Sequence, residues 1–341
     1  MADRRRVLGL AAGAAGGLLL GPAVSAAEQG AQYPQGPQDP QSPQSPQSPQ
    51  DSQLLASRLD TSHGPVDFQL YLPAGYATSG ETRYPLLLLL HGRGDRMAAW
   101  TRVRPMLDRL IREGRIPPLI AVLPDAPWSR RGSYYVDSAH EAGSPVETLL
   151  MRELLPHVDA RWRTRREREA RVVGGYSMGG YGALRYALAW PAQFAAALVL
   201  SPAVYTPLPP QGSSAREFGG FGRGPALFVD AIYREHNYPA LVAEAAQRHS
   251  DLPLCLFIAA GDQEYKNPDP AEALHDIDME AHLLFSRLSR TPHVQTALRI
   301  LDGGHDWLVW EPAFHEGLLW AAHGLGWRAS AGSEDATKAV V

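Results

Sequence analysis

Short apolar runs alternate with stretches of helical periodicity along the chain from about residue 55 to residue 327. Apolar or alternating runs of roughly four to eight residues are typical of strands. Such runs predict strands over residues 66–72, 86–90, 119–123, 171–173, 195–200, 254–260 and 296–301. Apolar residues that recur with the period of a helix predict helices over 98–113, 146–158, 181–190, 277–288 and 307–324.

The run at 86–90 consists of leucine alone and has no polar alternation. A strand with this pattern is buried on both faces, as in the centre of a parallel sheet. Strands that alternate with helices indicate an α/β architecture. We therefore predict one domain over residues 55–327, built as a doubly wound, mostly parallel sheet with helices on both faces.

One segment interrupts the alternation. About fifty residues, 203–252, separate two predicted strands and are rich in proline, glycine and aromatic residues. A connection of this length in a compact domain is usually functional or has helices of its own. We interpret it as a cap over the site, helical in part of its second half (226–249); a plain surface insertion is the alternative.

The first 27 residues have the pattern of a secretory signal peptide. Arg4, Arg5 and Arg6 precede an apolar stretch over 7–20, and small residues follow at 24–26. Consecutive arginines before a hydrophobic pair resemble a twin-arginine signal. We expect cleavage after Ala26 or Ala27 and a secreted or extracytoplasmic protein without stable membrane insertion.

Residues 28–54 repeat serine, proline and glutamine and lack the apolar side chains of a core. This composition predicts an extended, disordered linker. The polar tail over 328–341 is expected to be disordered as well. Whether the linker tethers the domain to the cell envelope is left open by the sequence, as is the oligomeric state.

Composition excludes some partners. The chain of 341 residues has a net charge of −4, so no overall positive field attracts nucleic acid. Its single cysteine, Cys255, lies in an apolar run and is expected to be a buried thiol rather than a nucleophile. Paired cysteines and a His-x-x-x-His motif are missing from the sequence, so we expect no metal site.

The most specific motif is Gly175-Tyr176-Ser177-Met178-Gly179, between a predicted strand and a predicted helix. In a nucleophile elbow, a sharp turn lifts one serine above the sheet, and flanking glycines avoid a clash at the bend. The following helix directs free N–H groups at the charge that develops on an attacked carbonyl. Ser177 is therefore the predicted nucleophile of a serine hydrolase or acyltransferase.

A serine hydroxyl needs an imidazole base, which in turn needs an orienting carboxylate. In this fold class the acid and then the histidine follow the serine along the chain. His305 lies just after the last predicted strand and is the predicted base. Glu264, three residues after Gly261, is the favoured acid, and Asp262 is the competitor.

An oxyanion hole requires two N–H donors, one of them from the residue after the nucleophile. Met178 is that residue, and Arg93 in the loop His91-Gly92-Arg93 is the expected second donor. Gly92 would let the backbone approach the substrate closely. We expect His91 to pack beneath the loop rather than to act as a base.

These motifs together resemble the esterase D and antigen 85-like esterases of the α/β-hydrolase fold. The matching stretches lie at residues 123–125, 134–138, 153–156, 175–184 and 303–307, and the likeness extends over roughly residues 60–327. The resemblance implies carboxylic-ester chemistry without a metal or organic cofactor, and it places Tyr135, Asp137 and Trp307 at the substrate cleft. The chain has Glu264 where aspartate is usual, and residues 203–250 match nothing in the family pattern.

Members of this family include feruloyl, acetyl-xylan and siderophore esterases, S-formylglutathione hydrolases and mycolyltransferases. The sequence thus predicts an exported serine esterase that acts on a small-molecule or polysaccharide-linked ester through an acyl-enzyme. One alternative is an acyltransferase that moves the acyl group to a sugar hydroxyl. Another is a non-catalytic cell-surface binding protein on a hydrolase scaffold. The acyl chain length is not specified by the sequence.

Overall fold

A computed structural model describes residues 51–125, 132–248, 252–266 and 269–327. The predicted signal peptide, nearly all of the predicted linker and the predicted tail lie outside these residues. All described residues belong to one contact unit. Within them, none of the helices combines the length and the apolarity that crossing a bilayer requires.

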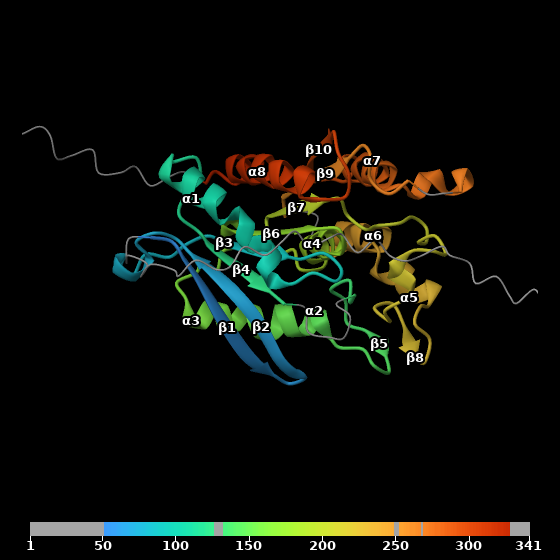
Figure 1. The fold of residues 1–341 in the computed structure, drawn as a ribbon, viewed down its shortest axis with the longest axis horizontal. Coiled ribbons are helices and arrows are strands. Elements are labelled where there is room, and N and C mark those ends of the chain that lie inside the picture. Colours follow the sequence, from blue (N-terminus) through green and yellow to red (C-terminus); the bar gives the residue numbers. More distant parts are fainter. Residues whose placement is uncertain (1–50, 126–131, 249–251, 267–268, 328–341) are drawn as a thin grey trace, which may run out of the picture. The chain divides into compact units, whose positions relative to one another are not determined.

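In the described part of the chain, eight strands form one sheet in the order β1-β2-β4-β3-β6-β7-β9-β10 (Figure 1). Neighbouring strands from β4 to β10 are parallel, whereas β2 is antiparallel to both β1 and β4. The strands are β1 (Gln53–Thr61), β2 (Gly64–Leu72), β3 (Leu86–Leu90), β4 (Ile120–Pro124), β6 (Arg171–Tyr176), β7 (Ala196–Leu200), β9 (Leu254–Gly261) and β10 (Val294–Leu301). A small second sheet pairs β5 (Ala139–His140) with β8 (Arg223–Gly224).

The α-helices are α1 (Arg104–Arg112), α2 (Val146–Thr148), α3 (Leu155–Arg161), α4 (Met178–Ala189), α5 (Asp230–His236), α6 (Tyr238–Arg248), α7 (Ile277–Leu288) and α8 (Trp307–Gly324). Short 3₁₀ segments lie at Tyr76–Thr78, Met97–Val103, Arg168–Ala170, Ser214–Arg216 and Pro270–His275. A π-helical segment, Leu149–Leu154, joins α2 to α3.

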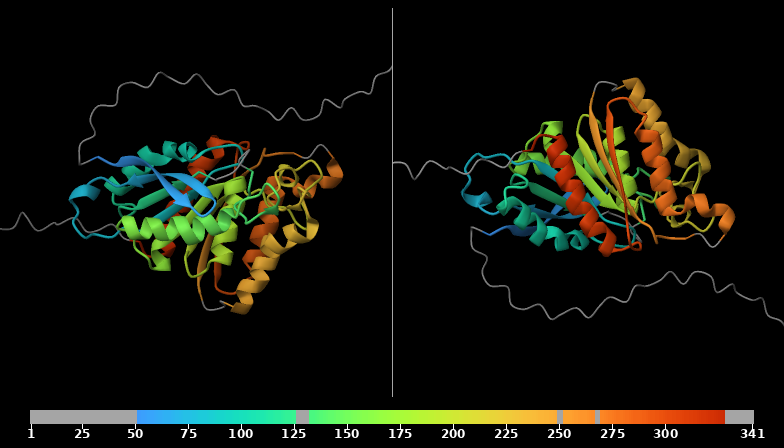
Figure 2. Two further views of the ribbon diagram at one scale, coloured as in Figure 1. Left: turned by 90° about the horizontal axis from the view of Figure 1, so that it is seen from below. Right: turned by 90° about the horizontal axis from the view of Figure 1, so that it is seen from above.

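Side chains of the central strand β3 reach both faces of the sheet. Leu86, Leu88 and Leu90 lie in one apolar cluster with residues of α4 and α7, and Leu87 and Leu89 lie in a second cluster with residues of α1 and α8. Figure 2 shows the strands β9 and β10 running between α7 and α8. The predicted doubly wound, mostly parallel sheet with helices on both faces is therefore confirmed.

Element boundaries follow the sequence pattern closely where side chains are buried. The predicted strand 86–90 and the helices 277–288 and 307–324 are found at those residues, whereas the strand predicted at 119–123 lies one residue later. The helix predicted over 146–158 contains the π-helical segment. Pro156 cannot donate a backbone hydrogen bond to the carbonyl of Arg152, so the α-helical ladder is interrupted there.

The first strand was not predicted, and it begins at Gln53, inside the range assigned to the linker. Its side chains are exposed or half-buried, so they show little apolar alternation. Pairing with β2 along its whole length stabilises it instead. Ser52, just before it, also accepts a hydrogen bond from Arg104 Nε at 3.0 Å and donates one to Asp108 at 2.9 Å.

The insertion between β7 and β9 carries α5 and α6, within the part expected to be helical. Its first half approaches the loop after β3, where the Arg93 guanidinium lies 5.6 Å from the centre of the Phe218 ring.

The single cysteine, Cys255, is buried, as expected.

Candidate active site

Ser177 occupies a strained turn between β6 and α4, with φ 56° and ψ −122°. A Cβ atom at Gly179 would lie 2.1 Å from the carbonyl oxygen of Leu90, and one at Gly175 would lie equally close to the carbonyl oxygen of Gly179. Only glycine fits at both positions. The two glycines therefore allow the turn that lifts Ser177 above the ends of the strands.

Three side chains from different loops form one hydrogen-bonded chain. His305 Nε2 lies 2.9 Å from Ser177 Oγ, and His305 Nδ1 lies 2.9 Å from a carboxylate oxygen of Glu264. Ser177 follows β6, Glu264 follows β9 and His305 follows β10. Because these strands are parallel, their carboxyl ends lie on the same side of the sheet. Residues far apart in the sequence come together there.

The two acidic candidates after β9 have different partners. Glu264 is fully buried, and its Oε1 accepts a hydrogen bond from the Gly261 N–H at 2.6 Å. Asp262 instead accepts a hydrogen bond from the Gly303 N–H at 3.1 Å, in the loop that carries His305. The structure thus brings Glu264, not Asp262, to the imidazole, and Asp262 supports the neighbouring turn.

One further side chain, Ser201, contacts Glu264, and a second, Trp310, contacts Ser201; neither is among the residues predicted from the sequence. Ser201 Oγ lies 2.5 Å from Glu264 Oε1, and the Trp310 indole Nε1 lies 2.9 Å from Ser201 Oγ. A serine directly after a predicted strand could have been noticed in the sequence, but its position beside Glu264 depends on the strand order, in which β7 lies between β6 and β9. Nothing in the helical pattern of α8 distinguishes Trp310 from an ordinary core residue.

The two expected oxyanion donors, Met178 and Arg93, lie in segments that adjoin Ser177. Met178 is the first residue of α4, where the N–H has no partner within the helix. The loop after β3 approaches so closely that a Cβ atom at Gly92 would lie 3.5 Å from Ser177 Cβ and 2.6 Å from the Tyr176 ring. Arg93, the next residue, is therefore placed beside the nucleophile, with its side chain exposed.

Buried groups hold this loop in place. The Tyr176 hydroxyl donates a hydrogen bond to Asp95 at 2.6 Å, and burial together with the Asp95 carboxylate raises the pKa of Tyr176 well above its usual value. His91 is fully buried and its Nε2 lies 3.6 Å from Asp125. His91 thus packs beneath the loop, as expected from the sequence.

The positions of Tyr135 and Asp137 differ from the expectation that both line the cleft. Tyr135 is fully buried, and its hydroxyl donates a hydrogen bond to the His91 carbonyl at 2.9 Å. The Asp137 carboxylate accepts hydrogen bonds from the N–H and the hydroxyl of Thr148, at 2.8 and 2.6 Å. Their polar groups are therefore used within the fold: Tyr135 supports the loop after β3, and Asp137 supports the start of the helix at Val146.

Aromatic and apolar side chains surround His305. Trp307 is half-buried, its ring centre lies 4.9 Å from that of Tyr176, and the Arg102 guanidinium lies 4.5 Å from it. Tyr265 and Leu308 are 71% and 81% exposed, and the Tyr265 ring lies 6.4 Å from the His305 ring. The rim near His305 thus presents apolar surface to an incoming substrate. The described residues contain no group of three or more His, Cys, Asp or Glu side chains suited to a metal ion.

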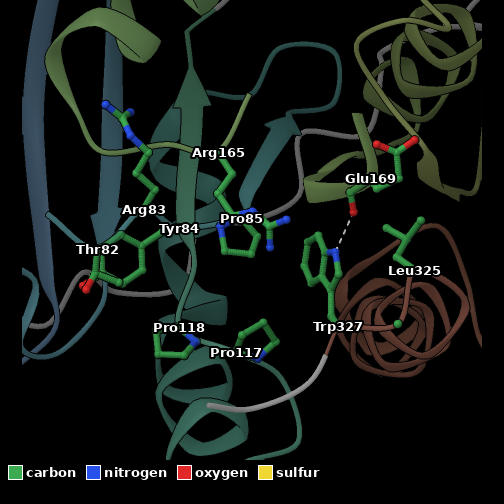
Figure 3. A pocket seen from close by; sticks show the side chains of 11 residues that line it. Thr82, Arg83, Tyr84, Pro85, Pro117, Pro118, Arg165, Glu169, Leu325 and Trp327 are labelled. Atoms are coloured by element: carbon green, nitrogen blue, oxygen red, sulfur yellow. Dashed lines mark hydrogen bonds between the residues drawn. The ribbon is translucent and has the colours of Figure 1, made fainter. Parts of the chain in front are cut away.

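A cavity of about 270 Å³ lies at the other end of the parallel strands, near their amino-terminal ends (Figure 3). Its walls include Tyr84 and Pro85 before β3, Pro117 and Pro118 before β4, and Trp327 after α8. Figure 3 shows the Trp327 indole directed at the Glu169 carbonyl, to which it donates a hydrogen bond of 2.7 Å. Tyr84, Pro85, Pro117 and Pro118 precede their strands, whereas the Ser177 site follows the strands, so the cavity is separate from that site.

The chain shares sequence with known esterases. Residues 61–321 match the family model described as "Putative esterase". The chain is 36% identical over 132 residues to an esterase of Mycobacterium tuberculosis, an alignment that covers 37% of this chain and 26% of that protein. It is 28% identical over 252 residues to the iron(III) enterobactin esterase of Escherichia coli, covering 72% of this chain and 51% of the relative. The chain thus spans about half or less of the length of these relatives.

A solved structure of a ferulic acid esterase superposes on the chain with a TM-score of 0.66 and 24% identity. The match covers 81% of this chain and 99% of that structure. At this level of identity the likeness shows the fold, which is that of the α/β-hydrolase esterases.

Proposed function

Because the chain belongs to the putative esterase family, we propose that it is a serine esterase that hydrolyses carboxylic esters through an acyl-enzyme. The observation that carries the proposal is the position of His305. Its two ring nitrogens lie within hydrogen-bonding distance of Ser177 and Glu264, at 2.9 Å each. A general base has to lie within this distance of the proton that it removes.

In the first half of the reaction, His305 takes the proton of Ser177 Oγ as this oxygen attacks the ester carbonyl carbon. The N–H groups of Met178 and Arg93 would hold the negative oxygen of the tetrahedral intermediate. The C–O bond of the ester then breaks, and the alcohol leaves with the proton from His305. Glu264 accepts the Nδ1–H bond and stabilises the imidazolium that forms in between.

In the second half, water gives a proton to His305 and attacks the acyl carbonyl carbon. The acid is released, and Ser177 recovers its proton. The exposed apolar side chains of Tyr265 and Leu308 at the rim favour esters with an apolar portion, because apolar contact with them removes surface from water.

The test is hydrolysis of p-nitrophenyl acetate, butyrate and octanoate, and of methyl ferulate, by the full chain and by Ser177→Ala. We expect turnover by the wild type and a fall in kcat of about a millionfold in the variant. Equal rates in the two proteins, with the variant folded, would contradict the proposal. Adding a sugar alcohol and analysing the products shows whether water or a hydroxyl takes the acyl group.

We also propose that the chain is exported. The support is the arrangement of Arg4, Arg5 and Arg6 before an apolar stretch and small residues. Fractionation of expressing cells should recover the protein outside the cytoplasm, and the triple arginine-to-lysine variant should remain inside. Cytoplasmic recovery of both proteins would contradict export.

A further inference from the structure

A buried hydrogen-bonded chain continues behind Glu264, on the side away from His305. Trp310 Nε1 bonds Ser201 Oγ at 2.9 Å, and Ser201 Oγ bonds Glu264 Oε1 at 2.5 Å. We propose that Ser201 and Trp310 are positioning residues that hold the Glu264 carboxylate toward His305. This inference rests on the proposed function, because it concerns the same acid and base.

Hydrogen-bond chemistry specifies the direction of this chain. An indole N–H can only donate, so Trp310 uses a lone pair of the Ser201 hydroxyl. The single hydroxyl proton of Ser201 then points to Glu264 Oε1, which accepts it. Glu264 Oε2 is left to accept from His305 Nδ1. With its proton at Nδ1, the imidazole presents its Nε2 lone pair to Ser177, which is what a base requires.

The surroundings keep these side chains in place. Ser201 and Glu264 are fully buried and Trp310 is 7% exposed, so water does not compete for their hydrogen bonds. The Ser201 N–H donates to the Ala259 carbonyl at 2.6 Å, which ties its backbone to β9. Glu264 Oε1 thus receives two donors, Ser201 and Gly261, from neighbouring strands.

Trp310 contacts His305 directly, and it contacts a residue next to Ser177 and the hydrogen-bond donor of Glu264. Its ring stacks on Tyr176, the residue before Ser177, with ring centres 4.3 Å apart and planes 22° apart. Its ring also meets the His305 ring edge-on, with centres 5.1 Å apart. A small movement of Trp310 would therefore disturb the nucleophile turn, the base and the acid together.

The experiment compares kcat and KM for p-nitrophenyl butyrate in Ser201→Ala, Trp310→Phe and the double variant. Each single variant removes one hydrogen bond of this chain. Trp310→Phe still has an aromatic ring that packs against Tyr176. Ser201→Ala removes a hydrogen bond to a charged group, which is worth enough to lower kcat about 10- to 100-fold. Trp310→Phe removes a hydrogen bond between neutral groups and should lower kcat by up to about tenfold. We expect KM to change by less than about threefold, because neither side chain reaches the rim.

Two comparisons separate positioning from a general structural effect. Both substitutions are repeated in a Glu264→Gln background, where Ser201→Ala should change kcat less than about twofold, because its partner carboxylate is already gone. Trp327→Phe is the matched control. It removes an indole hydrogen bond of 2.7 Å at the other edge of the sheet and should leave kcat unchanged.

The outcomes are distinct. Hydrolysis that needs Ser177, together with full kcat in Ser201→Ala, would overturn the inference and leave the serine esterase standing. The inference would also be overturned if Ser201→Ala lowered kcat as much in the Glu264→Gln background as in the wild type, since Ser201 would then act independently of Glu264. If the wild type hydrolyses no ester, the proposed function itself fails. Circular dichroism and thermal melting of every variant show that it is folded.

Discussion

Glu264 and Asp262 show how two carboxylates two positions apart acquire different roles. Glu264 is buried and faces His305, whereas Asp262 is exposed and holds the backbone of Gly303. The longer side chain and the later position let Glu264 turn back beneath the histidine loop.

Substitution separates the two roles. Glu264→Gln leaves the shape of the side chain but removes its charge, so the imidazolium loses its stabilising partner and kcat should fall by about 10⁴-fold. Asp262→Asn should lower kcat by less than about tenfold, because it acts only on the turn. Ester hydrolysis by the two purified variants measures this difference. A larger loss in Asp262→Asn would reassign the acid.

A second buried acid, Glu280 on α7, lies away from the triad. Its Oε1 accepts hydrogen bonds from the Thr206 N–H at 2.8 Å and from His275 Nδ1 at 2.7 Å, and the His275 ring also lies 3.3 Å from Glu272. Its Oε2 has no hydrogen-bond partner among the described residues. Burial raises the pKa of Glu280 from its ordinary 4.5 to about 7.

Stability should therefore depend on pH through Glu280. Between pH 4.5 and 7 the native protein keeps this proton while the unfolded chain has lost it. The contribution to the free energy of unfolding is greatest below pH 4.5 and falls by roughly 2–3 kcal/mol as the pH rises to 7. Urea unfolding at pH 5 and pH 8 should show this loss in the wild type and a smaller one in Glu280→Gln. An equal loss in both proteins would contradict the assignment.

At the scale of the elements, α4 is connected to α2 by a buried ion pair. Arg185 Nε lies 2.6 Å from Glu147 Oε2, both side chains are 9% exposed, and Trp190 Nε1 donates to Glu147 Oε1 at 2.7 Å. Arg185 also donates to the carbonyl of His236, at the end of α5. One guanidinium thus links the helix that follows the nucleophile to α2 and to the insertion.

Arg185→Met should destabilise the protein by about 3–5 kcal/mol, because Glu147 would be left as a buried charge without its cationic partner. Arg58→Met is the control, since it breaks an exposed pair with Asp67 in the β1–β2 hairpin and should change stability little. Equilibrium urea unfolding measures both. Similar effects of the two substitutions would show that the buried pair contributes no more to the free energy of unfolding than the exposed pair does.

At the scale of the whole molecule, the two edges of the parallel sheet differ in chemistry. The edge at the carboxyl ends of the strands brings Ser177, Glu264 and His305 together, and the opposite edge holds the cavity bounded by Trp327. The described part of the chain begins at Asp51, just before β1, and there Ser52 contacts Arg104 and Asp108 of α1.

A chain that starts at Asp51 should be more stable than one that starts at Leu54. The shorter chain loses the hydrogen bonds of Ser52 to Arg104 and Asp108 and the pairing of Gln53 with Leu72, which together should cost about 1–3 kcal/mol. Thermal melting of the two proteins measures the difference, and hydrolysis by both should have similar kcat. Equal melting temperatures would place the boundary later.

The sequence alone determined the α/β class, most strand and helix ranges, and the positions of Ser177 and His305 on loops after strands. These features are local, because apolar runs mark buried strands and a tight strand-to-helix turn requires glycine at Gly175 and Gly179. Neither depends on what lies across the sheet.

Only the tertiary structure decided which carboxylate meets His305, that Tyr135 is buried beneath a loop, and that Ser201 and Trp310 lie behind Glu264. It also revealed β1, which depends on pairing with β2 rather than on its own pattern. Each of these contacts joins residues distant in the sequence, and strand order and side-chain reach determine them. The spacing of the strands along the chain does not determine their order in the sheet, because the crossovers that join parallel neighbours vary in length.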